Sequence, residues 1–325
     1  MPLLISEKEV RALLSMDDLI AAMETALVAF SNGSVAQPLR TVVDAGGQGF
    51  FAVMPAHIPA PAALGAKLVT FFHGNTSAGL PTHLATILLM DPATGELVAI
   101  LDGRYITEAR TAAVSAVSVD FLAREDAGTL AIIGTGVQAR SHLQAITRVC
   151  DIRDIRVWSP SESSRTGFVR EMQPLTTAAI FIAASPREAV EGADVVVLAT
   201  AAREPVIQSD WIADGTHICA VGACRPDQRE MDSALVARAR VFVDSRTGAT
   251  SEAGDIIIPM KEGAFDASHI AAELGEVAAG RKPGRTSPRE VTIFKSLGMA
   301  VEDIAAAHLA FMKASERGLG RGFVL

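Results

Sequence analysis

A glycine-rich turn in the middle of the chain has the residue types and spacing of a dinucleotide-binding site. The apolar run TLAIIG leads into Gly134-Thr-Gly136-Val-Gln-Ala139, and a helical pattern, VQARSHLQAITRVC, follows it. In such a G-x-G-x-x-A turn the first glycine permits a sharp bend, the second lets the backbone approach a pyrophosphate, and the alanine keeps helix and strand close. The helix N-terminus adds main-chain donors and a positive dipole end. The turn predicts NAD(P) binding; the alternative is a doubly wound fold that holds no nucleotide.

The residues after the next apolar run, IRVW, bear on which nicotinamide cofactor is bound. NAD-binding domains normally carry an acid at the end of this strand, about 20 residues after the turn, which binds the ribose hydroxyls. Ser159 stands there instead, and Asp154 lies at the other end of the strand. Ser161 and Arg165 then supply a hydroxyl and a guanidinium that suit a 2′-phosphate. We predict NADPH in preference to NADH; the alternative is a solvated loop with a helix cap.

Three basic residues in the first third of the chain stand where positive charge is costly. Lys67 interrupts the apolar run ALGAKLVTFF, and Arg40 begins the run RTVVDAG. Arg110 falls in the first turn of a helix predicted to be capped by Thr107. Lysine is rarely buried without a partner, and a cation opposes the dipole at a helix N-terminus. A bound carboxylate would relieve all three conflicts; the alternative is separate salt bridges, such as one between Arg110 and Glu108.

Two other stretches carry groups that titrate or react. His83 enters a strand after the turn SAGLP and is a candidate proton donor, although a lone histidine at a strand edge is more often structural. In VGACRPDQREMD, Cys224 is either a thiol nucleophile or a small packed residue. The Arg-Pro-Asp corner that follows is either functional or a braced turn. The remaining histidines show no metal spacing, so we predict no metal site.

Composition narrows the class of protein. The chain has 325 residues, of which 49% are hydrophobic and 20% charged, enough for two globular domains. Its net charge of −8, with acids and bases interleaved, argues against a nucleic-acid surface. No apolar run approaches the roughly 18 residues of a membrane span, and the N-terminus lacks a signal-peptide pattern. Three cysteines without a C-x-x-C pair favour a reducing compartment, so we expect a cytoplasmic protein.

Two segments of the chain, with different patterns of apolar residues, must position these groups. Near the N-terminus, capping signals at Ser6 and Ser15 predict helices, and β-like runs joined by turns follow, including a hairpin signal at DPATG. From about residue 129, short apolar strands alternate with helical segments, which predicts a parallel sheet with helices on both faces. The fold class is therefore α/β: a Rossmann domain over 118–299, plus an α+β domain over 1–117 and a C-terminal helix within 300–325.

Several ordered pieces of the chain resemble the ornithine cyclodeaminase and mu-crystallin family. They are KLVTFF, GLPTH, ILDGRYITEARTAAVSA, IIGTGVQARSH, VGACRPDQREMD, VDSRTGATSEAGDI and IFKSLGMAVED, and they span essentially the full length. The resemblance implies that the first domain binds substrate and forms a homodimer. By position, it implies that Arg40, Lys67 and Arg110 hold the substrate carboxylate and that Thr82 contacts the substrate.

The stretch after Gly222 separates branches of that family. Cyclodeaminases resemble GGDC-P-G-K-T-E here, with an aspartate that handles the substrate amine, whereas this chain has Ala223 and Cys224. Its Arg-Pro-Asp resembles the mu-crystallin branch, whose members resemble ketimine reductases. We therefore predict an oxidoreductase acting on CH–NH groups, in proline metabolism, which reduces Δ1-pyrroline-2-carboxylate and/or Δ1-piperideine-2-carboxylate to L-proline or L-pipecolate. That branch resembles N-R-T after the second strand; here Arg165 replaces the missing arginine, or both cofactors are accepted.

In this reaction the protein chiefly orients its reactants. The candidate catalytic residues are Lys67, Asp227 (to stabilise the iminium or relay its proton) and His83 as the second choice for that proton. Ornithine cyclodeaminase, an alanine-type amino acid dehydrogenase and a non-enzymatic small-ligand-binding protein like mu-crystallin remain the alternatives. The residues predicted to contact the cofactor are Gly134, Gly136, Val137, Gln138, Ala139, Ser159, Ser161, Arg165, Thr200, Val221, Gly222, Ser296, Gly298 and Thr111.

Overall fold

A computed structural model describes residues 1–324, and the chain divides into two compact units. The first unit comprises Met1–Arg110 and the segment from Met299 onward, and the second comprises Thr111–Gly298. The sequence had suggested divisions after residues 117 and 299.

The first unit is built on a mostly antiparallel sheet with the strand order β15-β1-β6-β5-β4-β3-β2. Its strands are β1 (Leu3–Ile5), β2 (Thr41–Asp44), β3 (Gly49–Pro59), β4 (Ala62–Phe72), β5 (His83–Met90), β6 (Leu97–Asp102) and β15 (Arg321–Gly322). The helices are α1 (Glu7–Leu13), α2 (Met16–Ser31), α11 (Ala300–Arg317) and the 3₁₀ turn η1 (His73–Ala78), and α3 (Arg104–Leu122) begins in this unit. The predicted caps are present: Ser6 forms a capping box with Glu9, and Ser15 caps α2.

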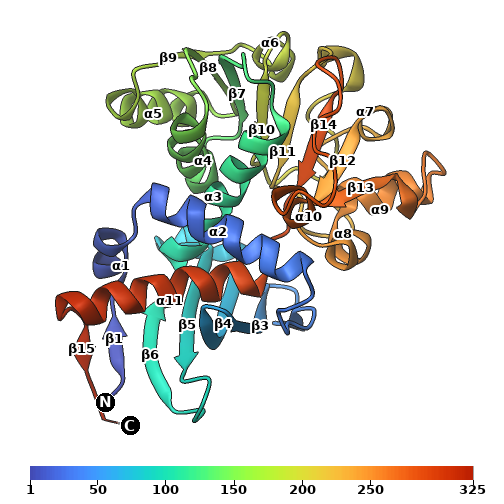
Figure 1. Cartoon of the computed structure of the whole chain (residues 1–325). Coiled ribbons are helices and arrows are strands. Elements are labelled where there is room, and N and C mark those ends of the chain that lie inside the picture. Colours follow the sequence, from blue (N-terminus) through green and yellow to red (C-terminus); the bar gives the residue numbers. More distant parts are fainter. Residues whose placement is uncertain (325) are drawn as a thin grey trace. The chain divides into compact units, whose positions relative to one another are not determined.

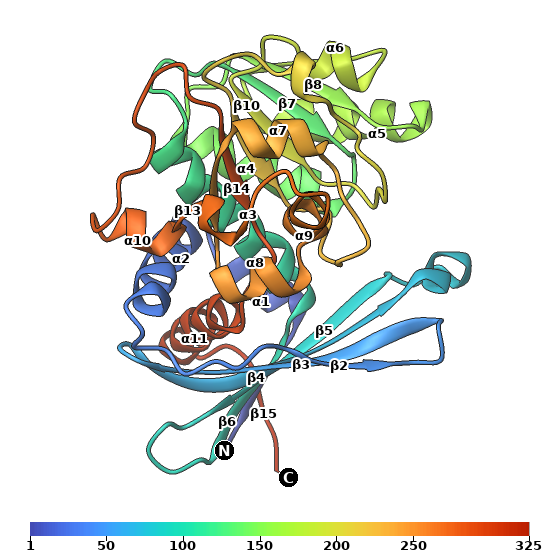
Figure 2. The ribbon, with the colours of Figure 1, turned by 90° about the vertical axis from the view of Figure 1, so that its right-hand side faces the viewer.

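One face of this sheet is covered and the other is open. Side chains alternate along β3 and β4, so that Met54 and Val69 are buried while Val53 and Leu68 keep some exposure. Helix α11 packs across β3, β4 and β5 on the buried side and also contacts α2 (Figure 1). Figure 2 shows β2 to β5 nearly on edge, with α11 and α2 on one side of β4. Lys67 is thus a cation on the covered, apolar face.

The second unit is a doubly wound parallel sheet with the order β13-β12-β14-β11-β10-β7-β8-β9. Its strands are β7 (Thr129–Ile133), β8 (Asp154–Trp158), β9 (Ala179–Ile182), β10 (Val195–Leu198), β11 (His217–Ala220), β12 (Arg240–Val243), β13 (Ile270–Glu273) and β14 (Thr292–Lys295). Its helices are α4 (Val137–Val149), α5 (Glu162–Met172), α6 (Pro186–Val190), α7 (Ser233–Arg238), α8 (Arg246–Glu252), α9 (Gly254–Lys261) and α10 (Leu274–Ala278), with 3₁₀ turns η2 (Gln173–Leu175), η3 (Ser209–Trp211) and η4 (Ala267–His269).

Helices cover both faces of this parallel sheet, as the alternating pattern predicted. Leu130 and Ile132 of β7 pack with side chains from α4 and α5. Their neighbours Ala131 and Ile133 pack on the opposite side with side chains from α6 and α7. The strand order changes direction between β7 and β10, which places a topological switch point beside the glycine turn. None of the helices within residues 1–324 is long and apolar enough to cross a membrane.

Candidate functional site

Lys67 is buried and held by a carboxylate from the other end of the chain. Its side chain projects from β4 and is 2% exposed, and its Nζ lies 2.5 Å from Oδ2 of Asp303. A longer contact of 3.5 Å joins Nζ to Oγ1 of Thr107. Burial lowers the pKa of Lys67 to about 8, because the attraction of Asp303 only partly offsets the loss of water and the charges of Arg110 and Arg40. Lys67 therefore titrates within the range of a routine pH profile.

Arg110 shares the same acid. Its Nε donates to Oδ1 of Asp303 at 2.9 Å, and its NH1 donates to Oε2 of Glu302 at 2.6 Å. Both acids are fully buried in the first turn of α11, where the helix dipole favours negative charge. Burial opposes ionisation of Asp303, but the charges of Arg110 and Lys67 outweigh it and hold the pKa of the carboxyl below its usual value. Asp303 therefore bridges the two cations and fixes their relative position.

The cluster retains an excess of positive charge. Arg40, directly before β2, lies near enough for its charge to lower the pKa of Lys67. With all groups ionised, three cations face the two carboxylates of Glu302 and Asp303. One further anion would neutralise the set. The geometry thus suits a monocarboxylate ligand.

The structure corrects two parts of the expectation for Arg110. Helix α3 begins at Arg104, not after Thr107, whose hydroxyl donates to the carbonyl of Gly103 at 2.7 Å. Arg110 is therefore in the second turn, and the predicted conflict with the helix dipole is wrong. Glu108, the suggested salt-bridge partner, pairs with Arg104 at 3.2 Å instead. The buried acids Glu302 and Asp303 explain how the two cations are tolerated in the interior. Sequence reasoning missed these acids, although both are present in IFKSLGMAVED.

His83 and Thr82 lie at the start of β5 in the same unit. Burial, and then the charge of Lys67, lower the pKa of His83 to about 4. His83 is therefore neutral at neutral pH, which argues against an imidazolium acid before an anion binds. The carbonyl of Thr82 accepts from the backbone of Phe72 at 2.8 Å, which ties this corner to β4.

The glycine turn in the second unit is shaped to receive a pyrophosphate. Gly134 has φ +116°, and a Cβ there would overlap the carbonyl oxygen of Ala199. Gly136 is the N-cap of α4, and a Cβ there would meet open space. The turn therefore leaves the helix N-terminus accessible to an anion, as the motif requires.

The end of β8 carries no acid, as the sequence predicted. Ser159 is 5% exposed, and its hydroxyl accepts from Oγ1 of Thr135 at 3.1 Å. NH1 of Arg165 donates to the carbonyl of Ser159, while its Nε has no hydrogen-bond partner among the described residues. Ser161 caps α5 through the backbone of Ser164. A guanidinium, rather than a carboxylate, thus stands beside this strand end.

Apart from Thr111, the other predicted cofactor residues lie on the loops at the carboxyl ends of the strands. Ser296, after β14, is 1% exposed, and its Oγ has no partner within residues 1–324. Gly298, at φ +78°, donates its N–H to Asp244 at 2.8 Å. An unpaired buried hydroxyl and the open glycine turn fit a nucleotide with many acceptors. Thr111, in α3, and Val221, after β11, are also buried.

The Arg-Pro-Asp corner forms an exposed turn. Nε of Arg225 lies 3.3 Å from Oδ1 of Asp227, and both side chains are about half exposed. Cys224 is exposed, and its Sγ donates to the carbonyl of Val221 at 3.2 Å. Within the second unit these contacts brace the loop. Among the described residues, no group of three or more His, Cys, Asp or Glu side chains is placed to hold a metal.

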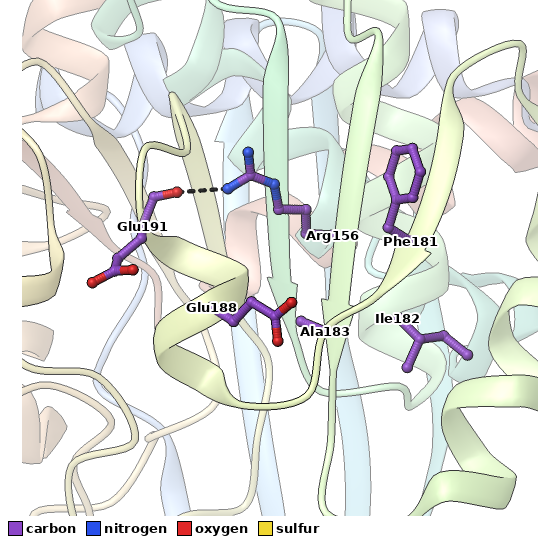
Figure 3. A pocket seen from close by; sticks show the side chains of 6 residues that line it. All are labelled: Arg156, Phe181, Ile182, Ala183, Glu188 and Glu191. Atoms are coloured by element: carbon purple, nitrogen blue, oxygen red, sulfur yellow. Dashed lines mark hydrogen bonds between the residues drawn. The ribbon is translucent and has the colours of Figure 1, made fainter.

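A pocket elsewhere in the second unit contains none of the predicted residues. It is lined by Arg156, Phe181, Ile182, Ala183, Glu188 and Glu191 at the edge formed by β8, β9 and α6 (Figure 3). NH1 of Arg156 donates to the carbonyl of Glu191 at 2.5 Å. Because its cation is bonded to the backbone and no glycine turn adjoins it, this pocket is a poor candidate for the chemistry above.

The fold and these residues define a dinucleotide-dependent enzyme with a Rossmann unit and a second unit that holds a buried cluster of cations and acids. The chain belongs to the ornithine cyclodeaminase/mu-crystallin family, whose model matches residues 2–318. It is 42% identical to the ketimine reductase mu-crystallin of Rattus norvegicus over 95% of this chain and 96% of that protein. These findings confirm the predicted family.

Two solved structures confirm the fold class. One is Δ1-pyrroline-2-carboxylate reductase of Thermococcus litoralis in complex with NADH and L-proline, with a TM-score of 0.96, 43% identity and coverage of 99% of this chain and 100% of that chain. The other is an archaeal alanine dehydrogenase dimer with bound NAD, with a TM-score of 0.95, 31% identity and coverage of 100% and 99%.

Replacing Asp303 by Asn should destabilise the protein strongly. The change leaves Lys67 and Arg110 buried with one carboxylate fewer, and breaking a buried ion pair costs about 3 kcal/mol or more. Chemical denaturation of Asp303→Asn and of the exposed control Asp120→Asn measures the difference. The control should change the free energy of unfolding by less than about 0.5 kcal/mol. Equal stability of the two variants would show that Asp303 does not carry the cluster.

Proposed function

We propose that the chain is an NAD(P)H-dependent reductase of cyclic ketimine carboxylates, which converts Δ1-pyrroline-2-carboxylate and/or Δ1-piperideine-2-carboxylate to L-proline or L-pipecolate. The observation that carries the proposal is the buried cluster in which Asp303 bridges Lys67 and Arg110 with positive charge in excess. The predicted activity agrees with relatives that are named ketimine reductase and Δ1-pyrroline-2-carboxylate reductase. The Rossmann unit supplies the matching cofactor site.

The cations fix the substrate by its carboxylate. The fork of Arg110 suits a bidentate contact, and the ammonium of Lys67 adds a point charge. Glu302 and Asp303 keep both side chains in place, so little rotamer freedom remains to be lost on binding. Because the carboxylate is attached to the imine carbon, anchoring it also fixes the position of that carbon.

Reduction of a protonated cyclic imine requires little acid catalysis by the protein, because the nitrogen already carries its proton. When bound, the reduced nicotinamide would supply a hydride, a proton with two electrons, which C2 of the C=N bond accepts. The nitrogen keeps its proton and takes the π electron pair, so that the cationic iminium becomes a neutral amine. A neutral His83 is compatible with this chemistry as a hydrogen-bonding group. Asp227 stays the candidate that stabilises the iminium, although it pairs with Arg225 in the described conformation.

We further propose that the enzyme accepts NADH and prefers NADPH. Relatives are solved with NADH and with NAD, so the family accommodates the unphosphorylated ribose. In this chain Ser159 replaces the acid that would repel a 2′-phosphate, and the guanidinium of Arg165 lies beside it, with NH1 bonded to the carbonyl of Ser159. A guanidinium favours a phosphate over a hydroxyl.

A second copy of the chain is the proposed occupant of the open face of the first unit's sheet. Val43 is 55% exposed, Leu84 is 41% exposed and Phe51, which pairs with Val43, is 36% exposed. With the partly exposed Leu68 and Leu88 they form a contiguous apolar face, which a monomer would expose to water. One relative is described as a dimer. A homodimer would bury this face.

The activity is tested by following nicotinamide absorbance with both ring sizes and both cofactors. We expect NAD(P)H oxidation with at least one of the two cyclic imines, faster with NADPH. The variant Lys67→Met should bind NADPH as the wild type does and lose the reaction. No oxidation in any combination would reject the proposal. Ammonia release from ornithine without added reductant would indicate a cyclodeaminase, and reduction of pyruvate with ammonia would indicate an alanine dehydrogenase.

Carboxylate binding should weaken as pH rises through about 8. Lys67 has a pKa lowered from 10.5 to about 8, so its positive charge is present below that value and is lost above it. Well above pH 8, Kd for an anion should rise by about tenfold per pH unit. Pyrrole-2-carboxylate is a suitable probe because its ring nitrogen does not titrate there. Lys67→Arg should flatten the profile; a flat wild-type profile from pH 7 to beyond 9 would contradict the role of Lys67.

The dimer proposal predicts that one charge on the open face separates the subunits. Leu68→Lys should give a monomer in sedimentation velocity, while the wild type gives a dimer, because a buried unpaired lysine is costly. Leu175→Lys is the control, since Leu175 is 60% exposed in the second unit. A wild-type monomer, or a dimer that survives Leu68→Lys, would show that another surface or no surface is used.

A further inference from the structure

A buried carboxylate in the second unit joins two loops that the catalytic proposal leaves unexplained. Oε1 of Glu230 accepts from the backbone N–H and the hydroxyl of Thr200, at 2.8 and 2.7 Å. Oε2 accepts from the N–H groups of Gly222 and Ala223, at 2.7 and 3.2 Å. Glu230 is fully buried. One side chain therefore ties the loop after β10 to the loop after β11.

These loops lie on the side of the switch point where the nicotinamide half of a dinucleotide binds. In a doubly wound sheet the cofactor lies across the carboxyl ends of the strands, with its pyrophosphate at the first turn. Here β8 carries the residues for the adenosine half on one side of β7, and β10 and β11 lie on the other. The loop after β10 adjoins the glycine turn, because Ala199 donates its N–H to Ile133 at 2.9 Å.

The loops after β10 and β11 are in direct backbone contact at Gly222 and Thr200. A Cβ on Gly222 would overlap the backbone of Thr200 and lie 2.5 Å from Oε1 of Glu230. The two backbones therefore meet directly, with the carboxylate bonded to both. A displacement of Glu230 would release the N–H groups of both loops at once.

A second buried acid fixes Glu230 in turn. Oδ1 of Asp255 accepts from the N–H groups of Glu230 and Met231, at 2.7 and 3.2 Å. Its Oδ2 lies 3.0 Å from Nζ of Lys295, on β14. All three charged side chains are fully buried. Burial and the charge of Asp255 raise the pKa of Glu230, and Lys295 opposes that rise.

We propose that Glu230 is a positioning residue that holds the loops after β10 and β11 in the conformation that receives the nicotinamide half of the cofactor. The inference rests on the proposed function. The bonding pattern requires a carboxylate, because each of its oxygens accepts from at least one main-chain N–H. Glutamine has the same shape, but in either orientation its NH₂ would face N–H donors and repel one loop.

The test compares the binding of whole and half cofactors to Glu230→Gln. Kd is measured by titration for NADPH and for 2′-phospho-ADP-ribose, which lacks the nicotinamide. We expect NADPH affinity to fall by about tenfold or more, the consequence of an unmatched buried donor, while the fragment binds within about twofold of wild type. With a cyclic imine as substrate, KM for NADPH should rise and KM for the imine should not.

Asp194→Asn is the matched control. Asp194 also accepts two main-chain N–H groups, from Gly128 and Thr129 at 2.9 Å each, but at the opposite end of β7. It should lower the unfolding temperature and leave both Kd values unchanged. Equal loss of both ligands in Glu230→Gln, or no loss of either, would overturn the inference. Failure of the wild type itself to bind NADPH would refute the cofactor proposal instead, so the two failures are distinguishable.

Discussion

The bridge from Asp303 to Lys67 and Arg110 is the interaction on which the first unit depends. It joins a strand, a helix and the C-terminal helix α11, three segments far apart in the sequence. Burying one cation without a partner would cost several kcal/mol, so β4 and α3 are compatible with their own charges only when α11 is docked. This requirement gives a physical reason for the chain to return to the first unit after the Rossmann unit is complete. The same contact that secures the fold also orients the candidate anion site.

The second unit also buries paired charges, at the carboxyl ends of interior strands of its parallel sheet. Glu230, Asp255 and Lys295 are buried together, and main-chain N–H groups supply the hydrogen bonds that the ion pair lacks. Buried charge is expensive and persists where its partners are fully specified. In both units such groups lie beside the residues that ligands are expected to contact. Each cluster sets loop and side-chain positions that an apolar core would leave less defined.

The sequence predicted what depends on local spacing and missed what depends on long-range partners. Alternation of apolar residues gave the two sheets, and the glycine turn gave the start of α4, because these signals lie within a few residues. Lys67 could be singled out as an anomaly, but nothing near it identifies Asp303, 236 positions later in the chain. The start of α3 was placed late, because Thr107 has the type of a cap while Asp102 accepts the N–H of Tyr105. The short strand β13 has no recognisable periodic pattern in the sequence. The hydrogen bonds from the loops after β10 and β11 to Glu230 have no such pattern either.

The charge on the candidate anion site also bears on how the proposed reaction would proceed. A net positive cluster attracts the carboxylate and, at longer range, disfavours the positive charge of a bound iminium. Transfer of a hydride removes that iminium charge, so the unfavourable interaction is present in the ground state and diminishes toward the transition state. The two acids limit the effect, because Glu302 and Asp303 neutralise most of the cationic charge before substrate binds. A cluster with fewer acids would repel the iminium more strongly, and one with fewer cations would not hold the carboxylate. The balance of three cations and two carboxylates therefore suits the carboxylate of an imino acid while limiting the repulsion of its iminium group.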